Sequence, residues 1–206
     1  MIKTKQRILN ESKDLFNEHG YSQVTIRMIA LKLQMSSGNL NYHFKKREEI
    51  LEALYFEMVQ EFDQRIEDLP QVEISLKQIK DTIHVSMERM IDYKFIWTDL
   101  FNILKSNKTI ETHFSTVYQT RIKGNLFVFN QLHEIGLMRT ASFEKEYDML
   151  AERMVIFGNT WIYNSELYRR KSTKHYLEDQ VNSMLAILYP YLSAKGMQEF
   201  DKLGSR

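Results

Sequence analysis

The hydrophobic residues of the chain recur every three or four positions, which is the period of an amphipathic α-helix, and no stretch shows convincing strand alternation. Two prolines and seven glycines in 206 residues also favour long helices with few tight turns. The pattern therefore predicts an all-α protein of about nine helices. We expect these helices near residues 4–19, 25–33, 36–44, 47–69, 75–92, 95–105, 110–134, 143–169 and 173–189.

Small polar residues mark several of the expected helix boundaries. Gly20 follows the first helix, at a position that favours a left-handed backbone. Thr25 is the expected N-cap of the second helix, and Ser36 or Ser37 that of the third. Ser142 is the expected N-cap of the helix near 143–169, and the last dozen residues are expected to be frayed.

Composition is that of an ordinary globular protein, with 27% charged and 43% hydrophobic residues. The absence of cysteine excludes disulfides, Cys-ligated zinc and thiol catalysis. No apolar run follows the basic first residues, so we expect no secretory signal. No segment approaches the roughly 18 apolar residues of a membrane span. The expectation is a cytoplasmic protein without a membrane partner.

Charge is unevenly distributed, although the net charge of the chain is only +1. Residues 1–50 carry nine Lys or Arg and five Asp or Glu, a net charge of +4. The remaining residues carry nineteen basic and twenty-two acidic side chains, a net charge of −3. A basic N-terminal segment points to a polyanionic partner, but four charges also arise by chance.

The segment "SSGNLNYHF", Ser36–Phe44, is unusually polar for a helix of this chain. It follows the short helix near 25–33 after two residues, which is helix–turn–helix spacing. In such a unit the second helix enters the DNA major groove, so it needs few apolar residues. Leu40 and Phe44, four positions apart, are enough to hold it to the neighbouring helices.

The runs "ILNESKDLFNEHGYSQVT" and "IRMIALKLQMSSGNLNYHFKKREEIL" resemble the N-terminal domain of the TetR family of bacterial transcriptional regulators. The resemblance covers residues 4–54, about a quarter of the chain. It implies a three-helix DNA-binding domain with a helix–turn–helix, followed by a helical domain that dimerises and binds an effector. We place the domains at residues 1–48 and 49–206.

The resemblance implies three kinds of DNA contact. Residues at the start of the second helix would hold phosphates, residues of the third helix would face the groove, and a further group would grip the flanking backbone. Any of these residues has an alternative role as a cap, a core-edge residue or a solvated charge. The implied contacts are Thr25 and Arg27 for the first group, Ser37, Gly38, Asn39 and Asn41 for the second, and Tyr42, His43, Lys46 and Arg47 for the third.

Two positions depart from the family pattern. Gln34 stands in the turn where the family usually has glycine, and a non-glycine residue in a left-handed conformation costs about 1–2 kcal/mol. Asn41 stands where the family usually has tyrosine. Asn41 therefore leaves the backbone grip open and admits a bidentate contact with adenine.

The C-terminal three-quarters of the chain has no comparable motif. Apolar stripes on the helices near 143–169 and 173–189 are candidates for a homodimer interface, or else they close the core of each subunit. Aromatic residues in the middle of the chain are candidates for a largely apolar effector site, or else ordinary core. The candidate effector residues are Trp97, Phe101, Tyr118, Arg121 and Trp161.

Other functional classes have little support in the sequence. His84 and Glu88 are one helical turn apart, but no third metal ligand stands at a useful spacing, so we expect no metal and no cofactor. The chain has no HExxH, Gly-rich phosphate loop or nucleophile elbow, so an enzyme is not expected. The resemblance to the TetR family implies a repressor that leaves a palindromic double-stranded operator when a small molecule binds. The alternative is a helical protein-binding adaptor without DNA-binding activity.

Overall fold

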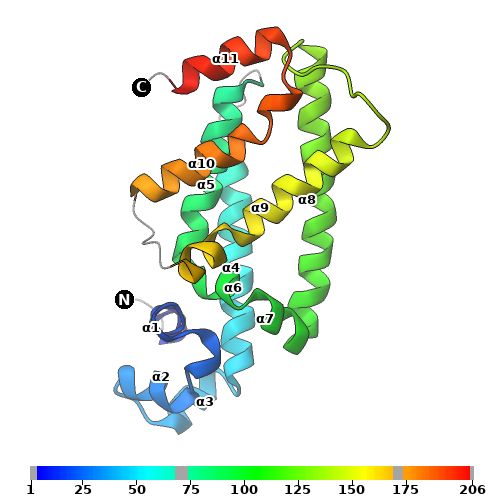
Figure 1. The fold of residues 1–206 in the computed structure, drawn as a ribbon. Helices are drawn as coiled ribbons and strands as arrows, with labels where there is room; N and C mark the ends of the chain where they lie inside the picture. The colour runs from blue at the N-terminus through cyan, green and yellow to red at the C-terminus, as the bar shows by residue number, and fades with distance from the viewer. Residues whose placement is uncertain (1–3, 68–73, 169–173, 205–206) are drawn as a thin grey trace. The chain divides into compact units, whose positions relative to one another are not determined.

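The computed structural model describes residues 4–67, 74–168 and 174–204. Within these ranges the chain forms eleven α-helices, two short 3-10 helices and no β-strand, so the all-α expectation is confirmed (Figure 1). The helices are α1 (Thr4–His19), η1 (Tyr21–Gln23), α2 (Ile26–Lys32), α3 (Ser37–His43), α4 (Arg47–Glu67), α5 (Leu76–Asp92), α6 (Lys94–Thr98), α7 (Leu100–Ser106), α8 (Lys108–Glu134), α9 (Glu146–Leu167), α10 (Lys174–Ala186), η2 (Tyr189–Tyr191) and α11 (Ala194–Gly204).

The helix count exceeds the expected nine for two reasons. The segment expected as one helix near 95–105 is two helices, α6 and α7, which meet at Asp99. The C-terminal residues expected to be frayed form α11 instead, so that expectation is wrong. Ser193 starts this helix, since its Oγ accepts the Gly196 N–H at 3.1 Å.

Two compact units divide the described residues. The first contains the residues up to 65 together with 90–114, and the second contains 66–89 and the residues from 115 onward. The helices α5 and α8 therefore contribute one end to each unit. The domain boundary predicted at residue 48 separates a DNA-binding part from an effector-binding part, and it does not coincide with the boundary between these two units. It stays a prediction.

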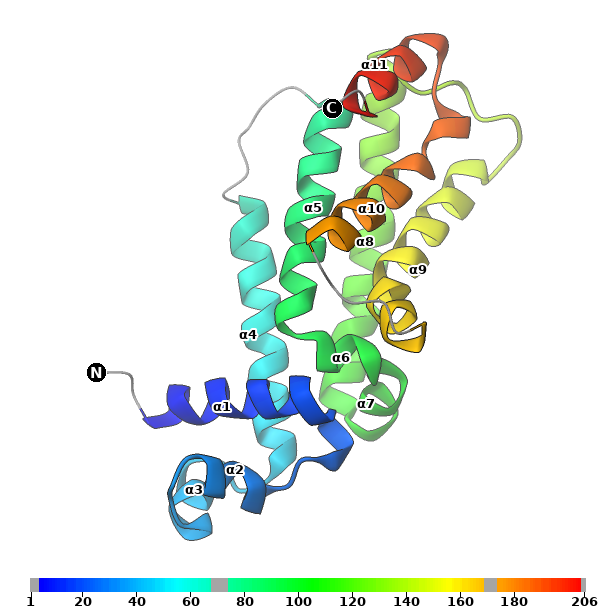
Figure 2. The ribbon, with the colours of Figure 1, turned by 60° about the vertical axis from the view of Figure 1, so that its left-hand side comes forward.

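The N-terminal part of the first unit, residues 4–54, is called the head below. Its helices α1, α2 and α3 lie together beside the start of α4 (Figure 2). They enclose an apolar core from which water is excluded, and burial of such side chains is worth about 1.5–3 kcal/mol each. The core residues include Ile8, Leu15, Phe16, Ile29, Leu40 and Phe44.

The turn between α2 and α3 contains a strained residue. Gln34 has φ 55°, so the left-handed backbone expected from the sequence is confirmed. The Met35 N–H donates to the Ala30 carbonyl and the Gln34 N–H to the Leu31 carbonyl, both at 3.0 Å. These two bonds form the Schellman motif that ends a helix, and it requires a positive φ at this position.

In the second unit, α9 and α10 pack against each other and bury the apolar stripes that the sequence offered as a dimer interface (Figure 1). Nine of those residues are buried within the chain, so they close its own core. These nine residues therefore belong to the core of the chain, and the assignment of α9 and α10 to a homodimer interface stays a prediction. The nine residues are Leu150, Ala151, Met154, Trp161, Ile162, Leu177, Val181, Leu185 and Leu188.

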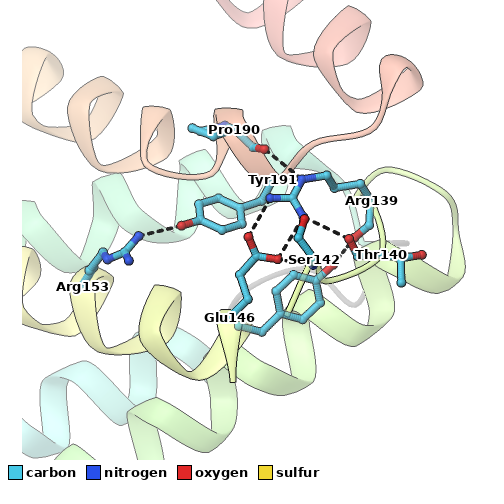
Figure 3. A network of polar contacts seen from close by, with 8 residues as sticks. Arg139, Thr140, Ser142, Glu146, Arg153, Pro190 and Tyr191 are labelled. Atoms are coloured by element: carbon cyan, nitrogen blue, oxygen red, sulfur yellow. Dashed lines mark hydrogen bonds and ion pairs between the residues drawn. The ribbon is translucent and has the colours of Figure 1, made fainter. Parts of the chain in front are cut away.

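The loop before α9 is joined to η2 by a polar cluster around Arg139 (Figure 3). The Arg139 guanidinium donates to both carboxylate oxygens of Glu146, at 2.8 and 2.9 Å, and to the Pro190 carbonyl at 3.1 Å. Ser142 does not cap α9 as expected. Its N–H donates to Glu146 at 2.6 Å, and α9 begins four residues later, after Lys145 with φ 64°.

Candidate nucleic-acid interface

The helix α3 is capped at its start and anchored by only two apolar residues. The Ser36 Oγ accepts the Asn39 N–H at 3.1 Å, so the expected N-cap is confirmed. Leu40 and Phe44 are buried in the head core. The side of the helix away from these two residues is therefore left to face outward.

The outward side of α3 carries polar groups that the fold does not use. Gly38, Asn39 and Asn41 are exposed, and the Tyr42 side chain is 85% exposed. In the part of the chain that the structure describes, the side chains of Asn39, Asn41 and Tyr42 make no hydrogen bond. Donors and acceptors that are exposed and unpaired in this way are available to base edges and phosphates.

Several cationic side chains of the head are exposed or lie at the ends of its helices. Arg27 on α2 and Lys46 before α4 are exposed. The Lys5 ammonium lies 5.2 Å from the centroid of the Phe44 ring, at the end of α3. Lys5 was not among the predicted DNA contacts. Nor was Lys45, which is exposed beside Lys46.

Three predicted contacts have structural roles as well. The Thr25 Oγ1 accepts the Met28 N–H at 3.3 Å, which confirms it as the N-cap of α2 and leaves its hydroxyl hydrogen free to donate. Ser37 is half-buried in the first turn of α3. His43 is half-buried and its ring meets the Tyr42 ring edge-on, with centroids 5.2 Å apart.

Arg47 differs from the other predicted contacts because its guanidinium is engaged inside the head. Its Nη1 donates to the carbonyls of Tyr21, Ser22 and Val24, at 3.1, 3.3 and 2.8 Å. The guanidinium also lies 4.2 Å from the centroid of the Tyr21 ring, and burial raises the pKa of that phenol. These contacts tie the start of α4 to the segment between α1 and α2.

The start of α4 already holds a carboxylate. The Glu49 Oε2 accepts the Lys45 N–H at 2.8 Å, so an acidic side chain lies at the N-terminus of the helix, where the helix dipole favours negative charge.

The five candidate effector residues belong to two different units. Trp97, which is 2% exposed, and Phe101, which is 75% exposed, lie in the first unit. Phe101 borders an open hollow of about 570 Å³ together with Leu104 and Lys105. Tyr118, Arg121 and Trp161 lie in the second unit. There the Arg121 Nη1 donates to the Asn159 Oδ1 at 3.0 Å, and Trp161 is buried near the Tyr176 ring.

His84 is directed toward α10 rather than toward a metal site. Its Nε2 lies 3.8 Å from Glu178, which also pairs with Lys80 at 2.9 Å. Among the residues that the structure describes, no three His, Asp or Glu side chains are grouped so that they could hold a metal ion. Nor does any described helix have the length and apolar character needed to cross a membrane.

This part of the chain is a helix–turn–helix, and its second helix presents unpaired polar groups in a head that also exposes cationic side chains. That arrangement is characteristic of DNA-binding proteins. Comparison with known families identifies the particular one. A family described as "Bacterial regulatory proteins, tetR family" matches residues 8–54, and one described as "Bacterial transcriptional repressor" matches residues 57–200. The chain therefore belongs to the TetR family of bacterial transcriptional regulators and is a DNA-binding regulator rather than an adaptor.

Individual relatives agree with this assignment. The chain is 22% identical over 171 residues to the fatty acid metabolism regulator protein of Bacillus subtilis. This match covers 79% of the present chain and 85% of the Bacillus protein. A TetR-family regulator from Marinobacter aquaeolei VT8 has a similar fold, with a TM-score of 0.87, 21% identity and coverage of 98% and 97% of the two chains. A regulator from Saccharomonospora viridis in complex with choline gives a TM-score of 0.70 at 19% identity, with coverage of 92% and 97%.

Proposed function

We propose that this chain is a homodimeric repressor that reads a palindromic operator through α3 and leaves it when a small molecule binds. The observation that carries the DNA contacts is the outward side of α3. Its Asn39, Asn41 and Tyr42 side chains are exposed and form no hydrogen bond with the described residues, so the fold gives them no structural role. These side chains are therefore free to form hydrogen bonds with a partner that carries donors and acceptors of its own.

The predicted contacts fall into two groups. Gly38, Asn39 and Asn41 meet base edges, and the absence of a side chain at Gly38 allows close approach. The Thr25 hydroxyl, Arg27 and Lys46 hold phosphates together with Tyr42, and Ser37 and His43 complete the edges of this surface. Arg47 acts indirectly, because its guanidinium fixes the start of α4 through three carbonyls.

Fluorescence anisotropy tests the DNA contacts. Duplexes selected from a random library and from the region upstream of the gene are titrated at several salt concentrations. The Asn41→Ala, Tyr42→Ala double variant should lose at least tenfold in affinity, since a good base contact is worth about 1–3 kcal/mol. Asn10→Ala, an exposed change on α1, is the matched control. Unchanged affinity in the double variant would refute the assignment of α3.

A second copy of the chain is the partner that an apolar stripe on α9 suggests. Met149, Ile156, Tyr163 and Leu167 are exposed and recur at intervals of seven, seven and four residues, which places them on one face. Two copies of this stripe can pair about a twofold axis, and a palindromic operator has the same symmetry.

Analytical ultracentrifugation tests this dimer. Ile156→Glu places a charge in the middle of the stripe and should yield monomers, whereas Asn130→Glu, at an exposed position of α8, should stay dimeric. Dimers that persist in Ile156→Glu would show that the interface lies elsewhere. Monomeric wild-type protein would exclude the homodimer itself.

The effector is proposed to be small and largely apolar. Both tryptophans of the chain, Trp97 and Trp161, are buried, so a ligand that enters either unit should change their fluorescence. Compounds of fatty acid metabolism are the first to test, because the relative from Bacillus subtilis is named for that process. A compound that quenches this fluorescence and also releases the operator fits the proposal. Quenching without release would exclude that compound as an effector.

A further inference from the structure

The helices α5 and α6 are separated by a break that the local sequence does not require. The segment "MIDYKFIW", residues 90–97, contains neither glycine nor proline, the usual interrupters of a helix. At Tyr93 the backbone leaves the helical region with φ −121° and ψ 36°, and no side chain of its own caps the new helix. Long-range contacts must therefore hold the break.

Two intrahelical bonds are missing at this break. In a continuous α-helix the Phe95 N–H would donate to the Ile91 carbonyl, and the Ile96 N–H would donate to the Asp92 carbonyl. Here the Ile96 N–H donates to the Tyr93 carbonyl at 3.0 Å instead. The Phe95 N–H and the Asp92 carbonyl have thus lost their helical partners.

One side chain of α1 replaces both partners. The Asn17 Nδ2 donates to the Asp92 carbonyl at 2.8 Å, and the Asn17 Oδ1 accepts the Phe95 N–H at 3.1 Å. A carboxamide can make these two bonds at once because it carries a donor and an acceptor. Asn17 therefore caps the end of α5 and the start of α6 from another helix.

Neighbours of Asn17 on the same face of α1 strengthen this joint. The Phe16 ring lies 5.2 Å from the Phe95 ring, centroid to centroid. The Lys13 ammonium lies 4.6 Å from the centroid of the Tyr93 ring. Lys13 and Asn17 are one helical turn apart, so the face that grips the junction is continuous.

The helix α4 holds the same junction from another direction. The buried Tyr93 places its hydroxyl 3.0 Å from the Glu57 Oε1 and 2.9 Å from the Glu61 Oε1. The Gln6 side chain of α1 also donates to Glu57, at 2.8 Å. Both α1 and α4 begin in the head, so the broken junction is fastened to two helices that belong to the same unit as the DNA-binding surface on α2 and α3.

We infer that Asn17 is a positioning residue that keeps the α5–α6 junction broken and thereby couples the shape of this junction to the placement of α1. When α1 withdraws, the junction regains its two helical bonds by straightening. By the reciprocity of linked equilibria, whatever bends or straightens α5 and α6 also shifts α1 and the head. Only the last arm of the test below rests on the proposed DNA-binding function.

Distance measurement between two spin labels tests the inference. The chain has no cysteine, so Glu88→Cys and Lys105→Cys, on the two sides of the junction, provide the only label sites. In Asn17→Ala the ratio of the straight form to the bent form should rise roughly tenfold, because the substitution removes two hydrogen bonds from the bent form and none from the straight form. The straight form gives the longer distance between the labels. Asp14→Ala, at an exposed position of α1, should leave the distance distribution as in the wild type. An unchanged distribution in Asn17→Ala overturns the inference.

A second variant keeps the test decisive if Asn17→Ala unfolds. Asn17→Asp retains an acceptor for the Phe95 N–H but loses the donor to the Asp92 carbonyl, so it should give an intermediate shift. A loss of thermal stability without any change of distance would mean a purely structural role and would also overturn the inference.

The same distance measurement with operator DNA bound adds a result that a purely structural role of Asn17 would not change. Saturating operator duplex should narrow the wild-type distance distribution, and it should no longer do so in Asn17→Ala protein that still binds the duplex. Equal narrowing in both proteins contradicts the coupling. If the wild type binds no duplex, the proposed function fails, and the arms without DNA still decide the inference.

Discussion

The outward side of α3 and the Arg139 cluster are both rich in polar side chains, yet they use them in opposite ways. On α3 the side chains of Asn41 and Tyr42 are exposed and make no hydrogen bond to the described residues. In the Arg139 cluster the guanidinium and the Glu146 carboxylate bind each other and nearby backbone groups (Figure 3). A polar group that the fold satisfies stabilises the fold, whereas one that it leaves unpaired is available to a partner.

The comparison extends to the way each region is held. The α3 region is fixed by contacts close in sequence, such as the Ser36 cap and the Schellman turn at Gln34. The C-terminal region is fixed by contacts that join residues about fifty positions apart, such as Arg139 with Pro190. Substitutions in the two regions should therefore separate operator affinity from stability.

The largest expected effect is that of Gly196→Ala in the C-terminal region. A Cβ at this position would lie 2.1 Å from the Leu137 carbonyl oxygen, a backbone atom that cannot swing away. We expect a loss of about 2–3 kcal/mol of unfolding free energy, measured by urea denaturation. The folded protein should bind the operator as the wild type does.

Gly124→Ala is the matched control for this prediction. Gly124 lies inside α8, and an added Cβ would meet nothing within 4 Å. Alanine is the better helix former there, so the variant should gain about 0.5–1 kcal/mol. Equal effects of the two substitutions would contradict the close approach at Gly196.

Arg47→Ala should have the next largest effect and should act within the head. It removes three hydrogen bonds to carbonyls and the stacking on Tyr21, so we expect a loss of about 2 kcal/mol of unfolding free energy. Arg47→Lys keeps the charge but not the planar fork, and it should recover only part of the stability. Full stability together with lost operator affinity would instead make Arg47 a direct phosphate contact.

Glu146→Gln should lower the melting temperature at neutral pH, by less than Arg47→Ala. The hydrogen bonds from Arg139, followed by that from the Ser142 N–H, lower the pKa of Glu146 to about 2 from its ordinary 4.5. The charged carboxylate therefore stabilises the fold fully above pH 4.5, and this contribution is lost as pH falls toward 2.

Melting temperatures measured between pH 7 and pH 2 check this prediction. The difference between the wild type and Glu146→Gln should shrink below pH 4.5 and vanish near pH 2. Glu144→Gln, at an exposed position of the same loop, should track the wild type throughout. A difference that stays constant with pH would mean that the ion pair does not contribute.

The smallest expected effect is that of Gln34→Gly in the head. Glycine relieves the strain of φ 55°, but it loses more entropy on folding, so the net gain should be about 0.5–1 kcal/mol. Lys145→Gly, at φ 64°, is the parallel case in the C-terminal region and should gain a similar amount. Gln60→Gly, inside α4, is the contrary control and should lose about 1 kcal/mol in thermal unfolding. A loss at Gln34 would show that its side chain contributes more than the strain costs.

Much of the head could be predicted from the sequence because its determinants are local. The bounds of α1 follow the apolar period to Gly20, and the caps at Thr25 and Ser36 need only residues three positions away. The residues with which the chain resembles the TetR family cluster for the same reason. Which of them touch DNA stays a prediction.

In the C-terminal region, the sequence did not show which apolar residues are buried in the core and which are exposed. Stripes of leucine, methionine and tryptophan on α9 and α10 fit a subunit core and a dimer interface equally well. Only the packing of these helices shows that the chain buries them itself and leaves Ile156 and Tyr163 outside. The helix α11 was missed although Met197, Phe200 and Leu203 recur every three residues, because only its tertiary contacts at Gly196 and Phe200 show that this short terminal stretch packs against the rest of the chain.

The sequence by itself determined the all-α class, the helix–turn–helix and the exposed polar residues of α3, because hydrophobic period, caps and turns act over a few residues. The tertiary structure decided which apolar stripe is core, where α5 breaks, and that Arg47 and Asn17 bind backbone groups of other elements. Those outcomes depend on partners 23 to 78 residues away, and the chain brings such partners together only when it folds.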